Sequence, residues 1–158
     1  MEASTTRGAA NPDPRRLAGF TLRAEVGGER AAIERVRDAV TPLGLPSRRL
    51  EALQTAVGEA TMNAMEHGSG YDPDKPVEVL VTATETAVSV AITDHGTGVD
   101  DRDVELPDID AKLRGDQSPR GWGLFLVRSL VDDLEETTEG GRHTVTLTMR
   151  LEAEEAAS

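Results

Sequence analysis

The sequence predicts an α+β domain, because two different periodicities of apolar residues occur along the same chain. Apolar residues at helical spacing recur in three stretches, and alternation of apolar and polar residues recurs in four shorter ones. Two of the alternating runs, 77–83 and 88–92, follow one another with Glu85 near the turn between them. Such a pair is typical of an antiparallel hairpin. We find no internal repeat.

Chain length and charge limit the class of protein. With 158 residues, the chain is long enough for one domain with a substantial core. A net charge of -12 and a pI near 4.6 argue against a nucleic-acid backbone or an anionic membrane as a direct partner. The acidic charge suits a basic protein surface as partner, or simple solubility.

Cysteine is absent and aromatic residues are scarce. Without cysteine, disulfides and thiolate metal sites are excluded. With 3% aromatic residues, we expect a core of Val, Leu, Ile and Ala, and no stacking of bases on aromatic side chains. No apolar run reaches the roughly 18 residues of a membrane span, and no signal-peptide segment opens the chain, so we expect a cytoplasmic protein.

The first part of the chain predicts an arm, a strand and a helix. Residues 1–16 are small, polar and proline-bearing, which is typical of a disordered arm. Alternation over 20–26 predicts a half-buried strand, and helical spacing over 32–40 predicts the first helix. The outer face of this helix is charged, which is usually a solvated face and sometimes a partner surface. We consider Arg35 and Arg37 there for partner contact.

A second helix is predicted from Pro46 up to the glycines at 68 and 70. Its apolar stripe consists of Leu50, Leu53, Val57, Ala60 and Ala64. Glu59 and Asn63 are four residues apart, so they lie on one side of the helix. The helix can therefore pack on a core with one side and present Glu and Asn to a cavity with another.

These two side chains fit phosphate chemistry. Glu59 is placed to act as a general base, and Asn63 offers a neutral oxygen to a hard cation such as Mg²⁺. By itself, the same spacing is more common on an ordinary solvated helix face. His67 follows one turn later, and we interpret it as a helix cap or packing residue, with a phosphate contact as the alternative.

A carboxylate and two glycines follow the second strand of the hairpin. Asp94 ends that strand, and its carboxylate can accept a hydrogen bond from an exocyclic amine such as that of adenine. Gly96 and Gly98 come next, and glycines let a ring or a phosphate approach the backbone closely. Alone, this pattern is more often a plain turn from strand to loop.

An acidic loop separates Asp94 from a second glycine pair. Residues 99–119 show no sustained apolar period, and a loop of this length is usually functional or disordered. Gly121 and Gly123 then open a helix, where free N–H groups and the helix dipole suit an anionic phosphate. We expect this helix to place four residues at core spacing: Leu124, Val127, Val131 and Leu134.

The last predicted element is a strand near the end of the chain. Apolar residues alternate with Thr144, Thr146, Thr148 and Arg150, and the apolar set is Val145, Leu147, Met149 and Leu151. Gly140-Gly141 precedes the strand, and residues 152–158 are expected to be a frayed tail.

The order of these motifs resembles the ATP-binding superfamily of DNA gyrase, sensor histidine kinases and mismatch-repair ATPases. Within it, the chain looks like the bacterial anti-sigma-factor serine kinases. The resemblance covers roughly residues 17–151 and is carried by 59–68, 72–79, 94–98 and 120–134. It implies a two-layer α/β sandwich of the Bergerat type, with a mostly antiparallel sheet and helices on one face.

The resemblance also implies a role for each matching residue. Glu59 would take the proton of a serine hydroxyl, and Asn63 would hold Mg²⁺ that bridges the ATP phosphates. Asp94 would accept a hydrogen bond from the adenine amine. The other residues that the resemblance assigns to nucleotide binding are Gly96, Gly98, Arg120, Gly121, Gly123, Leu124 and Thr144.

Two parts of this assignment are less definite. Residues 99–120 would form the ATP lid, and Lys112, Arg114 or Arg120 would contact the γ-phosphate, but the match does not decide which. Thr144 matches the threonine that helps to bind adenine through water, although two residues separate it from Gly141.

Three functions follow from the resemblance. The first is a switch kinase that binds a sigma factor and phosphorylates a serine of an anti-anti-sigma (STAS-domain) protein, with a homodimer as the expected state. The second is a module that binds nucleotide and partner with little or no kinase activity, and Glu59 favours the kinase over it. The third, a histidine-kinase catalytic domain, is disfavoured, since no helix pair with a phosphoacceptor histidine precedes residue 17.

Overall fold

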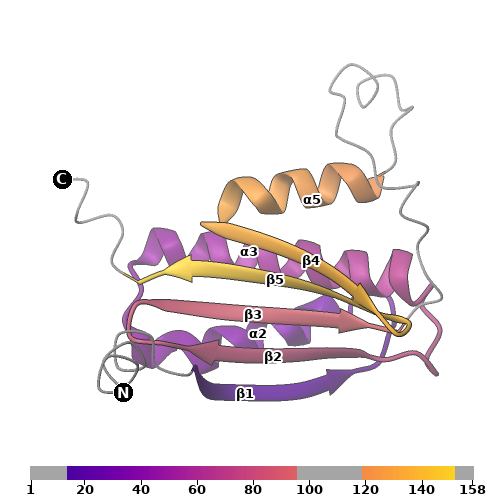
Figure 1. The fold of residues 1–158 in the computed structure, drawn as a ribbon, viewed down its shortest axis with the longest axis horizontal. Coiled ribbons are helices and arrows are strands. Elements are labelled where there is room, and N and C mark those ends of the chain that lie inside the picture. Colours follow the sequence, from indigo (N-terminus) through magenta and orange to yellow (C-terminus); the bar gives the residue numbers. More distant parts are fainter. Residues whose placement is uncertain (1–13, 96–118, 152–158) are drawn as a thin grey trace, which may run out of the picture.

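The computed structural model describes residues 14–95 and 119–151 (Figure 1). The elements are β1 (Arg15–Leu22), α2 (Glu29–Val40), η1 (Thr41–Leu43), α3 (Ser47–Asn63), η2 (Ala64–Gly68), β2 (Val77–Ala83), β3 (Ala87–Asp94), α5 (Pro119–Leu130), β4 (Asp133–Glu139) and β5 (Arg142–Arg150). The short element η1 is a 3-10 turn, and η2 is a π-helical turn that continues α3 directly.

The strands form one antiparallel sheet with the order β1-β2-β3-β5-β4. Helices α2, α3 and α5 lie on one side of this sheet (Figure 1). The prediction of an α+β, two-layer fold with helices on one face is therefore confirmed. None of the helices in the described ranges is long and apolar enough to cross a bilayer.

The core lies between the sheet and the helices. Alternation places every second side chain of each central strand on the helix side. The fully buried strand residues on this side include Val77, Val79, Val81, Val88, Val90, Ile92, Leu147 and Met149. Val36, Val40, Leu53 and Val57 meet them from α2 and α3. The core is thus built from small aliphatic residues, as expected, with Met65 and Met149 added.

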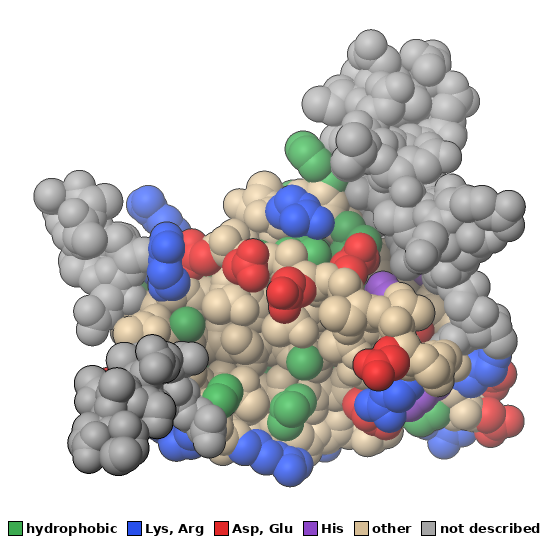
Figure 2. Space-filling view, viewed as in Figure 1, with side chains coloured by type: hydrophobic (Ala, Val, Ile, Leu, Met, Phe, Trp, Pro, Cys, Tyr) green, Lys and Arg blue, Asp and Glu red, His purple; other side chains and the backbone are tan. Residues whose placement is uncertain are grey.

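In Figure 2 the opposite face of the sheet is mainly tan, with a few apolar and charged side chains. Hydroxyl pairs link neighbouring strands there: Ser89 and Thr148 at 3.1 Å, and Thr93 and Thr144 at 2.8 Å. Leu80 is a large apolar residue on this face and is 40% exposed. We call this side of the sheet the open face.

The first strand begins earlier than its apolar pattern predicts. β1 runs from Arg15 to Leu22, and Val26, expected at the end of the strand, is 83% exposed. The reason lies in the pairing. Leu22 is opposite Val77, the first residue of β2, so the chain beyond Leu22 has no neighbouring strand to pair with.

The sequence did not predict β4. We expected one helix to reach Leu134, but α5 ends at Leu130 and Leu134 lies in β4. β4 is an edge strand in which Leu134 is the one buried residue, so it shows no alternation of apolar residues. Gly140 and Gly141, both at positive φ, form the turn into β5.

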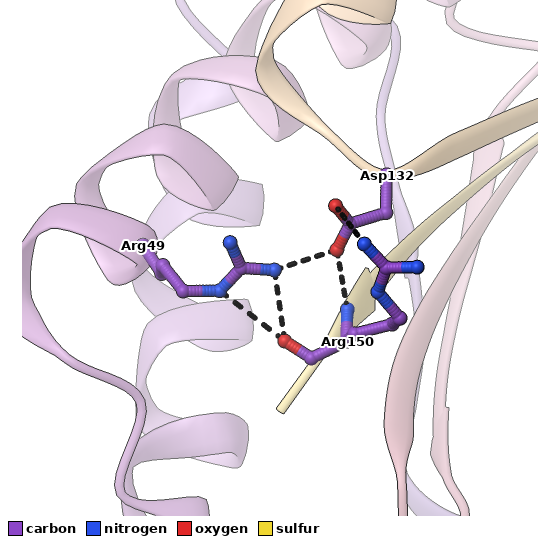
Figure 3. Close-up of polar contacts among 3 residues, drawn as sticks. All are labelled: Arg49, Asp132 and Arg150. Atoms are coloured by element: carbon purple, nitrogen blue, oxygen red, sulfur yellow. Dashed lines mark hydrogen bonds and ion pairs between the residues drawn. The ribbon is translucent and has the colours of Figure 1, made fainter. Parts of the chain in front are cut away.

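A charged cluster joins three distant parts of the chain (Figure 3). Arg49 of α3 donates to the carboxylate of Asp132 and, at 2.9 and 3.2 Å, to the carbonyl oxygen of Arg150. The backbone N–H of Arg150 donates to Asp132 at 2.7 Å. Burial by itself would raise the pKa of Asp132, but the Arg150 N–H and the Arg49 guanidinium outweigh it, and the pKa is lowered.

Candidate functional site

A small pocket lies where α3 and η2 pass over the ends of β3 and β5. Its described walls consist of Ala60, Asn63, Ala64, Gly68, Ile92, Asp94, Leu124, His143 and Val145. The apolar residues form the sides, and the polar groups gather at the end where β3 stops. Three of the predicted site residues, Asn63, Asp94 and Leu124, are therefore brought together by elements that are far apart in the sequence.

The position of Asn63 is set by a change of helix type. The regular α3 ends at Asn63, and the wider π-helical turn η2 begins at Ala64. The Nδ2 atom of Asn63 is buried and has no hydrogen-bond partner among the described residues. A half-turn of the amide would put its oxygen at the same place, so this side chain fits a cation or a ligand.

Asp94 and Gly68 are in direct contact. Asp94 is 4% exposed, and it lies on the helix side of β3, below the end of η2. A Cβ atom on Gly68 would overlap the carboxylate group of Asp94. Only glycine allows η2 to approach β3 this closely, so Gly68 shapes the site as well as ending the helix.

His143 bridges two carboxylates within the sheet. Its Nδ1 is 3.3 Å from Oδ2 of Asp94, and its Nε2 is 3.6 Å from Oε2 of Glu136. The hydrogen bonds to Asp94 and then to Glu136 raise the pKa of His143 to about 9, although burial opposes the shift. The ring is therefore an imidazolium at neutral pH, and its Nδ1–H donates to Asp94.

The pocket is narrow as it stands. The space that its walls enclose is about 10 Å³, close to the room that one water molecule needs. Leu124 of α5 forms part of one wall, and α5 packs on α3 beside it. A nucleotide base therefore enters only if these walls move apart.

The structure places the remaining predicted site residues as follows. Glu59 is half-buried on α3, one turn before Asn63, and is not part of the described pocket wall. Arg120, Gly121 and Gly123 lie in the first turns of α5. The predicted residues Gly96, Gly98, Lys112 and Arg114 lie outside the described residues.

The structure does not bring Thr144 into the pocket. Its hydroxyl is 2.8 Å from that of Thr93 on the open face of the sheet. His143, the residue before it, is paired with Asp94 in the strand register and takes the place beside the carboxylate. From the sequence we assigned no site role to His143. The alternation in β5 contained the missing signal, since Val145, Leu147 and Met149 require residue 143 to face the helices.

The other two histidines lie elsewhere. His95 contacts Glu78 at 3.0 Å, and Arg142 contacts the same carboxylate at 3.1 Å. His67 lies in η2, 3.7 Å from Glu66. Residues 14–95 and 119–151 contain no group of three or more His, Cys, Asp or Glu side chains that would hold a metal ion by themselves.

Comparison with known proteins gives the same architecture. A family model for the histidine kinase-like ATPase domain matches residues 22–149. The chain is 29% identical over 96 residues to the anti-sigma F factor of Clostridium perfringens (strain SM101 / Type A), which covers 60% of this chain and 67% of that protein. It is 27% identical over 126 residues to the anti-sigma F factor of Geobacillus stearothermophilus, and this match covers 79% of this chain and 84% of that protein.

A third relative carries a kinase name. The serine-protein kinase RsbW of Listeria monocytogenes serovar 1/2a is 30% identical over 95 residues, which covers 58% of this chain and 60% of that protein. The match spans 67% of the length of the Clostridium perfringens protein, and the match to the anti-sigma F factor of Clostridium beijerinckii spans 64% of that protein's length.

Two solved structures share the fold. One contains the RsbU and RsbW domains of Rv1364c from Mycobacterium tuberculosis, with a TM-score of 0.58 at 22% identity. The match covers 89% of this chain and 33% of that one. The other is the SiaB-SiaC complex from Pseudomonas aeruginosa, with a TM-score of 0.52 at 13% identity. This match covers 95% of this chain and 97% of that one. At these identities the likeness concerns the fold alone.

Proposed function

Since the chain belongs to the histidine kinase-like ATPase domain family, we propose that it is an ATP-binding anti-sigma factor with serine/threonine protein kinase activity. The observation that carries the proposal is the pocket in which Asp94, held beside Gly68 and His143, faces Asn63 and Leu124. The similarity to proteins named anti-sigma F factor and serine-protein kinase RsbW supports the choice of activity.

The base of the nucleotide is proposed to lie against Asp94. A carboxylate is a pure acceptor, so it matches the exocyclic amine of adenine. The apolar walls formed by Ala64, Ile92 and Leu124 suit a flat ring between them. Gly96 and Gly98 would add close backbone contacts at the edge of the ring.

The phosphates are proposed to lie between α3 and α5. The first turn of α5, with Gly121 and Gly123, offers backbone N–H groups and the positive end of the helix dipole. Arg120 lies in the same turn and would add a positive charge. Asn63, whose buried amide has no hydrogen-bond partner among the described residues, is the residue that would hold Mg²⁺. When bound, this ion would neutralise part of the phosphate charge.

Glu59 is proposed as the general base. Phosphoryl transfer needs mainly positioning and charge stabilisation, with a carboxylate to accept the proton of the attacking hydroxyl. Glu59 makes no hydrogen bond or ion pair to another residue of the described chain, so its oxygens are available. The serine oxygen would bond to the γ-phosphorus, the bond to ADP would break, and the proton would pass to Glu59.

The proposed partners are a sigma factor and a STAS-domain anti-anti-sigma protein, with a homodimer as the working state. The net charge of -12 favours basic partner surfaces over nucleic acid. On α2, Arg35 lies 4.9 Å above the ring of Phe20, and Arg37 pairs with Asp38 at 3.2 Å. Both arginines are exposed, so α2 stays our candidate for partner contact.

A partner-switching module with little or no kinase activity is the second candidate. One observation favours it: several relatives are named as anti-sigma factors. This candidate predicts nucleotide binding without transfer of the phosphoryl group.

Comparison of the native protein with Glu59→Gln separates the two candidates. For a kinase, calorimetry should give similar affinities for Mg-ATP, because glutamine keeps the shape of the side chain. Phosphorylation of STAS-domain proteins from the same genome, measured by intact mass, should fall at least about 100-fold, since a general base contributes that much. Equal rates for both proteins would remove Glu59 from the mechanism, and binding without any transfer would favour the module.

A further inference from the structure

His143 is a charged residue of the pocket to which the resemblance assigns no role. It lies on β5 directly opposite Asp94 of β3 in the antiparallel register. Its side chain is 20% exposed, and its two ring nitrogens face Asp94 on one side and Glu136 of β4 on the other. The three side chains therefore form a carboxylate–imidazole–carboxylate row across neighbouring strands.

This row determines how Asp94 presents its oxygens. A carboxylate oxygen accepts hydrogen bonds, and a donor fixed beside the carboxylate limits its rotation. The Nδ1–H of His143 lies 3.3 Å from Oδ2 of Asp94 and holds the carboxylate in one orientation in the pocket. The pKa of about 9 for His143 agrees with a ring that stays charged at neutral pH.

We propose that His143 is a specificity-determining residue, which holds the carboxylate of Asp94 in place as an acceptor, so that the pocket selects a purine with a 6-amino group over one with a 6-oxo group. The inference rests on the proposed ATP-binding function and adds a cause for its base selectivity. The 6-amino group of adenine donates to the carboxylate, whereas the 6-oxo group of hypoxanthine would set two acceptors against each other. His143 acts through Asp94, so it is a positioning residue.

The test compares Mg-ATP with Mg-ITP by calorimetry in the native protein and in two variants. The native protein should prefer ATP by about 10- to 100-fold, the effect of one mismatched buried hydrogen bond. His143→Leu removes the donor to Asp94, so ATP affinity should fall about tenfold and the preference should fall below about threefold. His143→Asn keeps an N–H donor on a short side chain, so it should retain most of the preference.

Thr146→Val is the matched control, because Thr146 lies on β5 but faces the open side of the sheet. It should behave as the native protein does. Circular dichroism shows whether His143→Leu folds. If it does not, Glu136→Gln takes its place in the test. This variant removes one carboxylate partner of His143, so it should also lower the preference for ATP. If every folded variant keeps the native preference for ATP over ITP, the role of His143 is overturned and the proposed function is not affected. A native protein that binds neither nucleotide would overturn the proposed function itself.

Discussion

Gly68 is the single residue on whose size the pocket depends most. It ends η2 and lies against the carboxylate of Asp94, where any Cβ atom would overlap that group. Asp94 is buried and held by His143, so it has little room to move away. One small residue on a helix thereby determines where a strand residue can present its oxygens.

Gly68→Ala should therefore lower both stability and nucleotide binding. Overpacking at such a contact costs about 1–3 kcal/mol of the free energy of unfolding. Because Asp94 is displaced, the affinity for Mg-ATP should fall at least about tenfold, measured by calorimetry on the folded protein. Gly70→Ala is the control: its φ of +62° makes alanine unfavourable, but nothing lies within 4 Å of the new methyl group. Gly70→Ala should lower stability and leave ATP affinity unchanged, and equal affinities for all three proteins would contradict the role of Gly68.

Single residues also show how far the sequence could predict the site. The sequence alone predicted that Glu59 and Asn63 lie on one side of a helix and that Asp94 lies at the end of a strand. Thr144 was assigned by its match to a family motif, and alternation along β5 places it on the open face, with His143 on the helix side. The contact between Gly68 and Asp94 could not be predicted, because it depends on how η2 is placed over β3.

Among the elements, α3 is attached at both ends. Its C-terminal end carries Asn63 into the pocket, and Arg49 near its N-terminal end binds Asp132 and the carbonyl oxygen of Arg150 (Figure 3). Asp132 lies between α5 and β4, so the cluster connects the helix of the site to the edge of the sheet. We infer that this cluster helps to hold α3 in position against β5.

Asp132→Ala should destabilise the fold by about 1–3 kcal/mol, because the N–H of Arg150 and the guanidinium of Arg49 lose an acceptor. The pKa of Asp132 is lowered in the folded protein, so its stabilising contribution is complete above the ordinary value of 3.8 and is lost as pH falls through the lowered value. Asp132→Asn keeps an oxygen for Arg150 but loses the charge. Urea unfolding at pH 7 should give the highest free energy of unfolding for the native protein, a lower one for Asp132→Asn and the lowest for Asp132→Ala.

The same denaturation at pH 3 should show smaller differences between these three proteins. Differences that are as large at pH 3 as at pH 7 would contradict an ionic contribution from Asp132.

Strands and helices differed in how well the sequence predicted them. β2, β3, β5 and the apolar stripe of α3 were predictable, because each buries one face and leaves a clear period. β4 was missed, since its partner strand rather than its own composition determines its structure. The π-helical turn η2 leaves no mark in the apolar pattern, although the end of the helix was predicted close to its observed position.

At the scale of the molecule, residues 14–95 and 119–151 form one antiparallel sheet with helices on one side and an open face on the other (Figures 1 and 2). This arrangement places the pocket at the end of the helix layer, where α3, η2 and α5 meet the ends of β3 and β5. The order of the motifs along the chain was sufficient to predict the fold class. The narrowness of the pocket was not predictable, since it depends on the packing of α5 against α3.

Titration of the ¹⁵N-labelled protein with Mg-ATP, followed by NMR, tests the central claim most directly. We expect saturable shifts at the backbone amides of Asn63, Gly68, Asp94 and His143, which line the pocket. The amides of Leu80 and Thr146, on the open face, should stay in place. Absence of shifts at millimolar ATP, or shifts confined to the open face, would contradict a nucleotide site between the helices and the sheet.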